Sequence, residues 1–133
     1  MTVSDSAVRP SPYFVVSCSI SNSRTDPADA FAALDLRLGR IIRAEPNERA
    51  RRPSYKLWID FGPLGQKTSN AQLRALYRAE DLVGRLIVAA MNLGTRNIAG
   101  FMSEVLVLGV PDSAGDVVLL SVERDAPPGA KVF

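Results

Sequence analysis

Arginine side chains crowd the middle of this 133-residue chain. Residues 37–96 carry twelve basic and five acidic side chains, a net charge of +7, whereas residues 1–36 carry −2 and residues 97–133 carry −3. Guanidinium groups bind phosphate oxygens in pairs, so such a run is typical of a surface that binds nucleic acid. A solvated loop, partly neutralised by Glu45 and Glu48, explains the same composition. The densest part of the run is Arg37, Arg40, Arg43, Arg49, Arg51, Arg52 and Lys56.

The residue types that most enzyme sites need are missing. The chain has no histidine and a single cysteine, Cys18, which excludes an imidazole base, an internal disulfide and a cysteine–histidine zinc site. Asp35 and Asp60 stand alone, without a second carboxylate for acid–base catalysis. No glycine-rich loop ends in Lys-Ser or Lys-Thr, as a nucleotide-binding loop would. We therefore expect no catalysis, no metal and no cofactor.

The elements that position these side chains follow from the spacing of apolar residues. Asp26 and Pro27 predict the start of a short helix. Alternating apolar and polar residues predict half-buried strands at 34–42 and 55–61. A short polar strand is expected at 66–68, followed by a helix, because Ser69 and Gln72 have the spacing of a capping box. Further strands are predicted at residues 85–93, 104–108 and 117–122, separated by glycine-containing loops.

Five main strands with a helix between the third and fourth predict a mainly β fold, a five-stranded OB-fold barrel with short terminal extensions. The pattern alone also fits an α+β sandwich. Residues 1–24 lack sustained periodicity and are expected to form a flexible N-terminal extension, with the barrel domain at 27–133. The longest apolar run, residues 86–91, is too short for a membrane helix. We expect a cytoplasmic protein without membrane insertion.

Five short segments carry a resemblance to a known family. They are residues 34–41 (LDLRLGRI), 53–62 (PSYKLWIDFG), 67–72 (KTSNAQ), 101–109 (FMSEVLVLG) and 128–133 (PGAKVF). The first resembles the opening strand of the tRNA-binding-domain family, an OB-fold module also appended to some aminoacyl-tRNA synthetases. The other four look more specifically like the CsaA-type members of that family. The resemblance covers about residues 27–133, and the sequence departs from it at Asn70, where a second serine is frequent.

The resemblance implies a function that composition alone does not. CsaA-type proteins are homodimers described as export-related chaperones, and their domain is similar to modules that bind tRNA by shape. The implied partners are therefore tRNA, unfolded or precursor polypeptides, and a second copy of the chain. A tRNA-binding module without chaperone activity is the alternative.

Eight residues are candidates for the RNA-binding surface. Lys67 and Arg96 match positions that the family uses as basic residues near its RNA-facing loops, and Ser103 matches a loop serine. Ser69 and Gln72 could contact ribose or phosphate, although capping a helix already explains them. The full set is Arg37, Arg40, Lys67, Ser69, Gln72, Asn92, Arg96 and Ser103.

The remaining candidates are argued from their strand positions. Arg37 and Arg40 fall on polar positions of the first strand, and we expect both to point outward. The amide of Asn92 can read a base edge or close a turn. Trp58 lies on the polar phase of its strand, where a second subunit would cover the indole or a nucleobase would stack on it.

Overall fold

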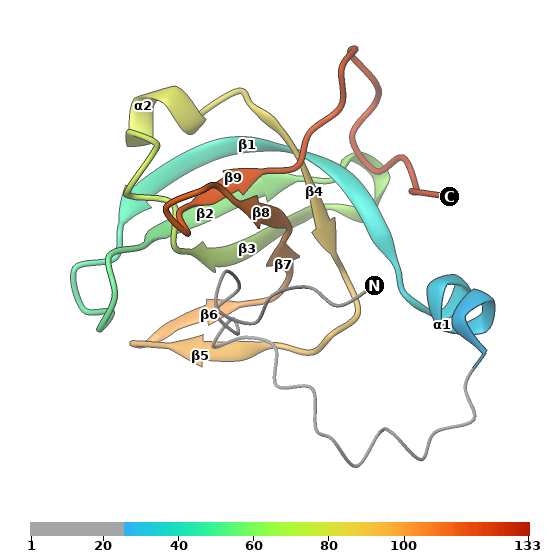
Figure 1. Ribbon diagram of the computed structural model, residues 1–133, viewed down its shortest axis with the longest axis horizontal. Coiled ribbons are helices and arrows are strands. Elements are labelled where there is room, and N and C mark those ends of the chain that lie inside the picture. The colour runs from blue at the N-terminus through green and yellow to red at the C-terminus, as the bar shows by residue number, and fades with distance from the viewer. Residues whose placement is uncertain (1–25) are drawn as a thin grey trace.

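The computed structural model describes residues 26–133, and its centre is a strongly curved sheet of five antiparallel strands (Figure 1). In spatial order, the strands are β3 (Gln66–Ala71), β2 (Tyr55–Asp60), β1 (Leu36–Pro46), β4 (Leu86–Ala90) and β7 (Leu106–Val107). The sheet curls until its ends meet: the carbonyl of Thr68 in β3 accepts hydrogen bonds from the N–H groups of Glu104 (2.8 Å) and Val105 (3.2 Å). This nearly closed barrel confirms the predicted mainly β, OB-type fold.

Short helical segments and two hairpins are added to the barrel. They are α1 (Pro27–Ala33), η2 (Gly62–Leu64), α2 (Ala79–Leu82), β5 (Arg96–Ile98) with β6 (Phe101–Ser103), and β8 (Gly109–Pro111) with β9 (Val117–Leu119). Between β3 and β4 the structure has the single helical turn α2, which begins ten residues after the predicted start at Ser69. Residues 94–100, predicted as a loop, instead contain β5 and its turn. That turn consists of Ala99 and Gly100, both with positive φ (53° and 88°), as the tightest hairpins require.

The core follows from the alternation in β2. Leu57, Ile59 and the following Phe61 are fully buried, whereas the residues between them face outward. Gly39 in β1 faces the same interior, and a Cβ atom added there would lie 2.6 Å from side-chain atoms of Ile59 and Phe61. The two strands are therefore closely packed at this point, and only glycine leaves room for both neighbours.

At the start of β1, both of its edges are paired with other segments of the chain. Over its first residues β1 pairs with β4, whereas β2 joins it only from Arg40 onward. The remaining edge at residues 36–38 is occupied by residues 129–132, through three main-chain hydrogen bonds of 2.7–2.9 Å. Figure 1 shows this C-terminal segment running beside the start of β1. The first half of β1, residues 36–41, thus has main-chain partners on both sides, whereas residues 43–46 pair with β2.

The prediction of a helix beginning at Ser69 is wrong. Ser69 lies within β3, opposite Leu57, and is only 1% exposed. All six residues of β3 pair with β2, and this long-range pairing outweighs the local capping signal, because helix propensity is a weak preference. One helical hydrogen bond remains downstream, from the N–H of Tyr77 to the carbonyl of Leu73 (3.1 Å).

Two further expectations concern the ends of the chain and the membrane. The extension predicted at 1–24 lies outside the described residues. Within the described part, no helix is long and apolar enough to cross a membrane.

Candidate nucleic-acid interface

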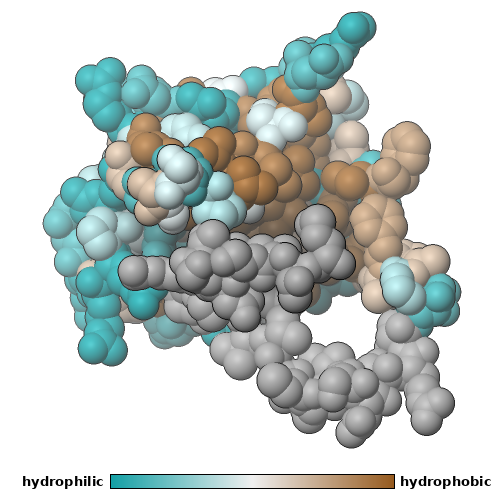
Figure 2. Space-filling model, viewed as in Figure 1, coloured by the Kyte–Doolittle hydropathy of each residue, from teal (hydrophilic) through white to brown (hydrophobic). Residues whose placement is uncertain are grey.

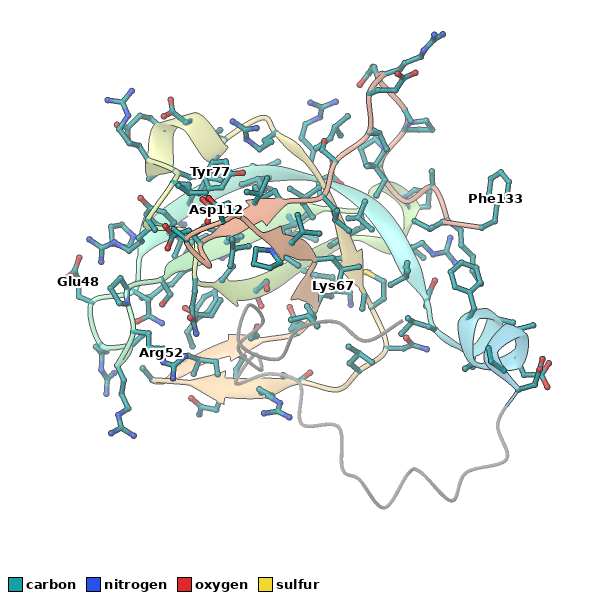
Figure 3. All side chains as sticks on the ribbon, in the orientation of Figure 1. Glu48, Arg52, Lys67, Tyr77, Asp112 and Phe133 are labelled. Atoms are coloured by element: carbon teal, nitrogen blue, oxygen red, sulfur yellow. The ribbon has the colours of Figure 1, made fainter. Side chains whose placement is uncertain are left out.

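A groove opens between the β1–β2 loop, residues 47–54, and the β5–β6 hairpin. We call it the loop–hairpin groove. Its volume is about 790 Å³, within the usual size of a ligand site. Figure 3 shows Arg52 on the loop beside the hairpin, with Glu48 farther out. The groove is lined by Arg49, Ala50, Arg51, Arg52, Ser54, Asn70, Gln72, Asn97, Ile98 and Ala99, a set with three arginines and no carboxylate.

The groove arginines take no part in the ion pairs that most other arginines of residues 26–133 make. Within residues 26–133, the ion pairs involve Arg37, Arg40, Arg43, Arg74, Arg78 and Arg124. None of these pairs includes Arg49, Arg51 or Arg52. Three arginines and one glutamate, Glu48, give residues 47–54 a net charge of +2, and Glu48 lies 3.9 Å from Arg74. This net positive charge can attract an anionic polymer.

A buried set of amides and hydroxyls holds the β1–β2 loop, residues 47–54, which we call the arginine loop. Nδ2 of Asn47 donates to Oδ1 of Asn70 (2.8 Å), and the hydroxyl of Ser54 donates to the same oxygen (3.2 Å). The N–H of Asn70 donates in turn to Oγ of Ser103 (3.0 Å). Asn47, Ser54 and Asn70 are at most 3% exposed. Because Asn47 and Ser54 stand at the two ends of the loop, Asn70 fixes the points where the loop leaves the barrel.

Arg37 and Arg40 do not reach this groove. Nε of Arg37 contacts Asp35 (2.6 Å), and Nη1 of Arg37 donates to a carbonyl of the C-terminal segment (3.1 Å). Nη1 of Arg40 donates to the carbonyl of Gly84 (2.7 Å). The expectation that both side chains point outward together is wrong, because β1 pairs with β4 without a bulge between them. A separation of three residues then places them on opposite faces of the strand.

Asn92 and Lys67 also lie away from the groove. Oδ1 of Asn92 accepts the N–H of Asp35 (2.9 Å), and its Nδ2 donates to the carbonyl of Ala33 (2.8 Å). The amide thus closes the junction between α1 and β1, which favours the turn-closing alternative. Lys67 is half-buried and stands opposite Ile59, so it lies on the inner side of the sheet.

The other four candidates lie closer to the groove. Ser69 and Ser103 are buried, at 1% and 4% exposure, so neither hydroxyl is available to RNA in this arrangement. Gln72 lines the groove, and Arg96 lines a small neighbouring hollow together with Ser103. Arg49, Arg51 and Arg52 line the groove but were not among the eight candidates, although their density in the basic run was the available signal.

An aromatic cluster lies next to the groove on the outer face of β2. The guanidinium carbon of Arg43 is 4.4 Å from the centroid of the Trp58 ring, and the Phe101 ring meets Trp58 edge-to-face at 5.4 Å. Nζ of Lys56 is 5.7 Å from the Phe101 ring. Phe101 pairs with Ile98 of the groove wall across the hairpin. We call Arg43, Lys56, Trp58 and Phe101 the Trp58 cluster.

The described residues offer no metal site, since no group of three or more His, Cys, Asp or Glu side chains could hold an ion there.

A family model described as "Putative tRNA binding domain" matches residues 36–131. Methionine–tRNA ligase 1 of Sorangium cellulosum is 38% identical over 104 residues, and the methionine–tRNA ligase of Thiobacillus denitrificans is 40% identical over 116 residues. The alignments cover 78% and 83% of this chain but only 15% and 17% of the ligases.

Solved structures of similar size also match. The chaperone CsaA from Bacillus anthracis is 47% identical, with a TM-score of 0.77 over 82% of this chain and 99% of that protein. The CsaA chaperone protein from Picrophilus torridus is 36% identical, with a TM-score of 0.76 over 82% of this chain and 100% of that protein. Both the fold and the length of the matched domain are thus shared with these two proteins.

Proposed function

Because this chain belongs to the tRNA-binding-domain family, and to its CsaA-type members, we propose that it is a non-catalytic module that binds tRNA through the loop–hairpin groove. The observation that carries the proposal is the loop with Arg49, Arg51 and Arg52, none of which forms an ion pair with a carboxylate of residues 26–133. RNA duplexes bury their base edges in a deep, narrow groove, so arginines on an anchored loop contact phosphates and follow shape.

Charge reversal tests this proposal directly. Arg51→Glu combined with Arg52→Glu replaces two exposed guanidiniums that make no described contact, so folding should be unaffected. We expect affinity for bulk tRNA, measured by fluorescence anisotropy, to fall by about tenfold or more. The loss should be similar for individual tRNA species.

The matched control carries the same change in charge at a distance from the groove. Arg78→Glu combined with Arg124→Glu alters two exposed arginines that pair only with neighbouring acids. Its affinity for tRNA should stay within about threefold of the unaltered protein, since distant exposed charges are largely screened. Equal losses in both double variants would show that the groove is not the binding site.

A second function, the holding of unfolded or precursor polypeptides by a homodimer, is favoured by exposed apolar side chains. Figure 2 shows apolar surface gathered over the region of β8 and β9, and Figure 3 shows Phe133 projecting from the barrel. Patches of this kind mark protein-binding surfaces. The exposed large apolar residues in this part of the chain are Val110, Leu120, Val122 and Phe133. Both CsaA proteins named above are described as chaperones, and such a role would act on export-bound chains in the cytoplasm.

This second function needs its own measurements. Sedimentation should give the mass of a dimer, and the protein should suppress aggregation of a chemically unfolded client at both low and high salt, because apolar contacts are not screened. Val110→Ser combined with Val122→Ser should weaken client holding. Salt-sensitive tRNA binding without client holding would support the alternative, a tRNA-binding module alone.

A further inference from the structure

Trp58 occupies an unusual place for the largest side chain in the chain. It lies on the outward-facing phase of β2, between Lys56 and Asp60, and it is not part of the buried core. An indole on a polar face gains little from folding unless something packs on it. The Arg43 guanidinium lies over the indole, and the Phe101 ring meets it in an edge-to-face arrangement.

The guanidinium over the indole has one carboxylate partner: Nε and Nη2 of Arg43 both donate to Oε2 of Glu45. The Arg43 side chain is 60% exposed and the Glu45 side chain 41%. Exposed ion pairs of this kind contribute little to stability. A planar nucleobase can therefore take the place of Arg43 over the indole, and the displaced guanidinium is then available to the adjoining phosphate.

The cluster is continuous with the groove. Lys56 stands opposite the groove residue Asn70 in the β2–β3 pairing, and Phe101 pairs with Ile98 of the groove wall. Trp58 follows Lys56 by two residues on the same face of β2, a distance of about 7 Å along the strand. One RNA strand can thus lie with phosphates at the groove arginines and a base over Trp58.

We propose that the Trp58 cluster is a stacking platform for an unpaired nucleotide, so that the protein binds a single-stranded segment of RNA in addition to recognising folded shape. The inference rests on the proposed RNA binding and deepens it by naming the RNA structure that this face takes. Stacking of this kind tolerates every base, because each base has a π face. The platform therefore adds a requirement for an unpaired nucleotide rather than for a sequence.

The chain contains one tryptophan, so its fluorescence reports on Trp58 alone. Titration with short oligoadenylate should quench the emission, whereas a blunt-ended RNA duplex should bind with little quenching. Trp58→Ala should weaken oligoadenylate binding by about five- to hundredfold, measured by anisotropy, and Trp58→Phe should retain most of the affinity. Phe31→Ala, which removes an exposed aromatic ring on α1, is the matched control and should change nothing.

The outcomes separate this inference from the proposed function. One combination of results overturns the platform and leaves the proposed function intact. In it, labelled tRNA binds through Arg51 and Arg52, oligoadenylate leaves the Trp58 emission unchanged, and the Trp58→Phe and Trp58→Ala variants bind oligoadenylate as tightly as the unaltered protein. The platform is also overturned if emission depends on protein concentration and Trp58→Phe changes the mass in sedimentation, since a second copy then covers the indole. Failure of every RNA to bind would overturn the proposed function, and the platform with it.

Discussion

The side-chain amide of Asn47 donates a 2.8 Å hydrogen bond to Oδ1 of Asn70, which joins the start of the arginine loop to the strand that lines the groove. Ser54, at the other end of the loop, donates to the same oxygen. This buried oxygen, together with the 2.9 Å main-chain hydrogen bond from the N–H of Asn47 to the carbonyl of Ser54, joins the two ends of a loop whose other side chains are largely exposed.

Removing that oxygen should destabilise the protein. Asn70→Ala leaves the buried donors of Asn47 and Ser54 without their acceptor, at a cost of about 1–3 kcal/mol for each unsatisfied group. Urea unfolding followed by circular dichroism measures the free energy of unfolding. Gln66→Ala, an exposed position in the same strand, is the control and should change it by less than about 0.5 kcal/mol. Equal stability of both variants would show that the buried bonds contribute nothing net.

Binding of tRNA should weaken steeply with salt. Each phosphate contact contributes about −0.7 to −0.9 to the slope of log K against log salt concentration. Arg51→Gln combined with Arg52→Gln should therefore make the slope shallower by about 1.4–1.8. The slope is measured by anisotropy at a series of potassium chloride concentrations. An unchanged slope would mean that these guanidiniums do not contact phosphate.

A substitution at Ala99, in the β5–β6 hairpin turn, should stabilise the protein. Ala99 has a φ of 53°, a conformation that costs an alanine roughly 1 kcal/mol and that asparagine tolerates better. Ala99→Asn should raise the free energy of unfolding by about 0.5–1 kcal/mol, measured in urea. Ala114→Asn, in an exposed turn without a positive φ, tests whether asparagine alone has this effect. A gain in both variants would argue against relief of backbone strain.

Replacing Gly39 should destabilise the barrel. Gly39→Ala places a methyl group 2.6 Å from side-chain atoms of Ile59 and Phe61, and overpacking of this kind costs about 1–3 kcal/mol. Phe61→Leu should recover part of that loss when combined with Gly39→Ala. A double-mutant cycle in urea measures the coupling between the two positions. Strictly additive losses would place the damage elsewhere.

Affinity for tRNA should hardly depend on pH between 6 and 8. The chain has no histidine, and its arginines stay charged throughout this range. A hydrogen bond to Asp81 raises the pKa of Arg78 further above neutrality, so this group keeps its charge as well. Dissociation constants at constant ionic strength should agree within about twofold across the range. A steep change would reveal a titrating group outside this set.

The barrel strands could be predicted where one face is buried. In β2 the apolar residues alternate with polar ones, and the structure buries Leu57 and Ile59 as that period requires. β3 is short and polar, so its local signal resembled a helix cap at Ser69. The pairing of Ser69 with Leu57 depends on the whole sheet, and no local pattern encodes it.

The site was harder to predict because it joins distant segments. Arg51 and Ile98 line one groove although 46 positions separate them in the sequence. The basic run indicated the kind of chemistry, whereas the pairing of each arginine with an acid is a property of the folded chain. Arg37 and Arg40 illustrate this, since both bind parts of their own chain.

The hydrogen bonds between residues 36–38 and residues 129–132 have a consequence for how the protein is made. On the ribosome, the second partner of the first strand emerges about ninety residues after that strand, which takes about 5–20 s at ordinary rates of synthesis. During this interval the strand presents unpaired N–H and C=O groups to any neighbouring nascent chain. Pairing at this edge therefore waits until residues 129–132 have left the ribosome, and slowing translation lengthens the period in which two chains can join there.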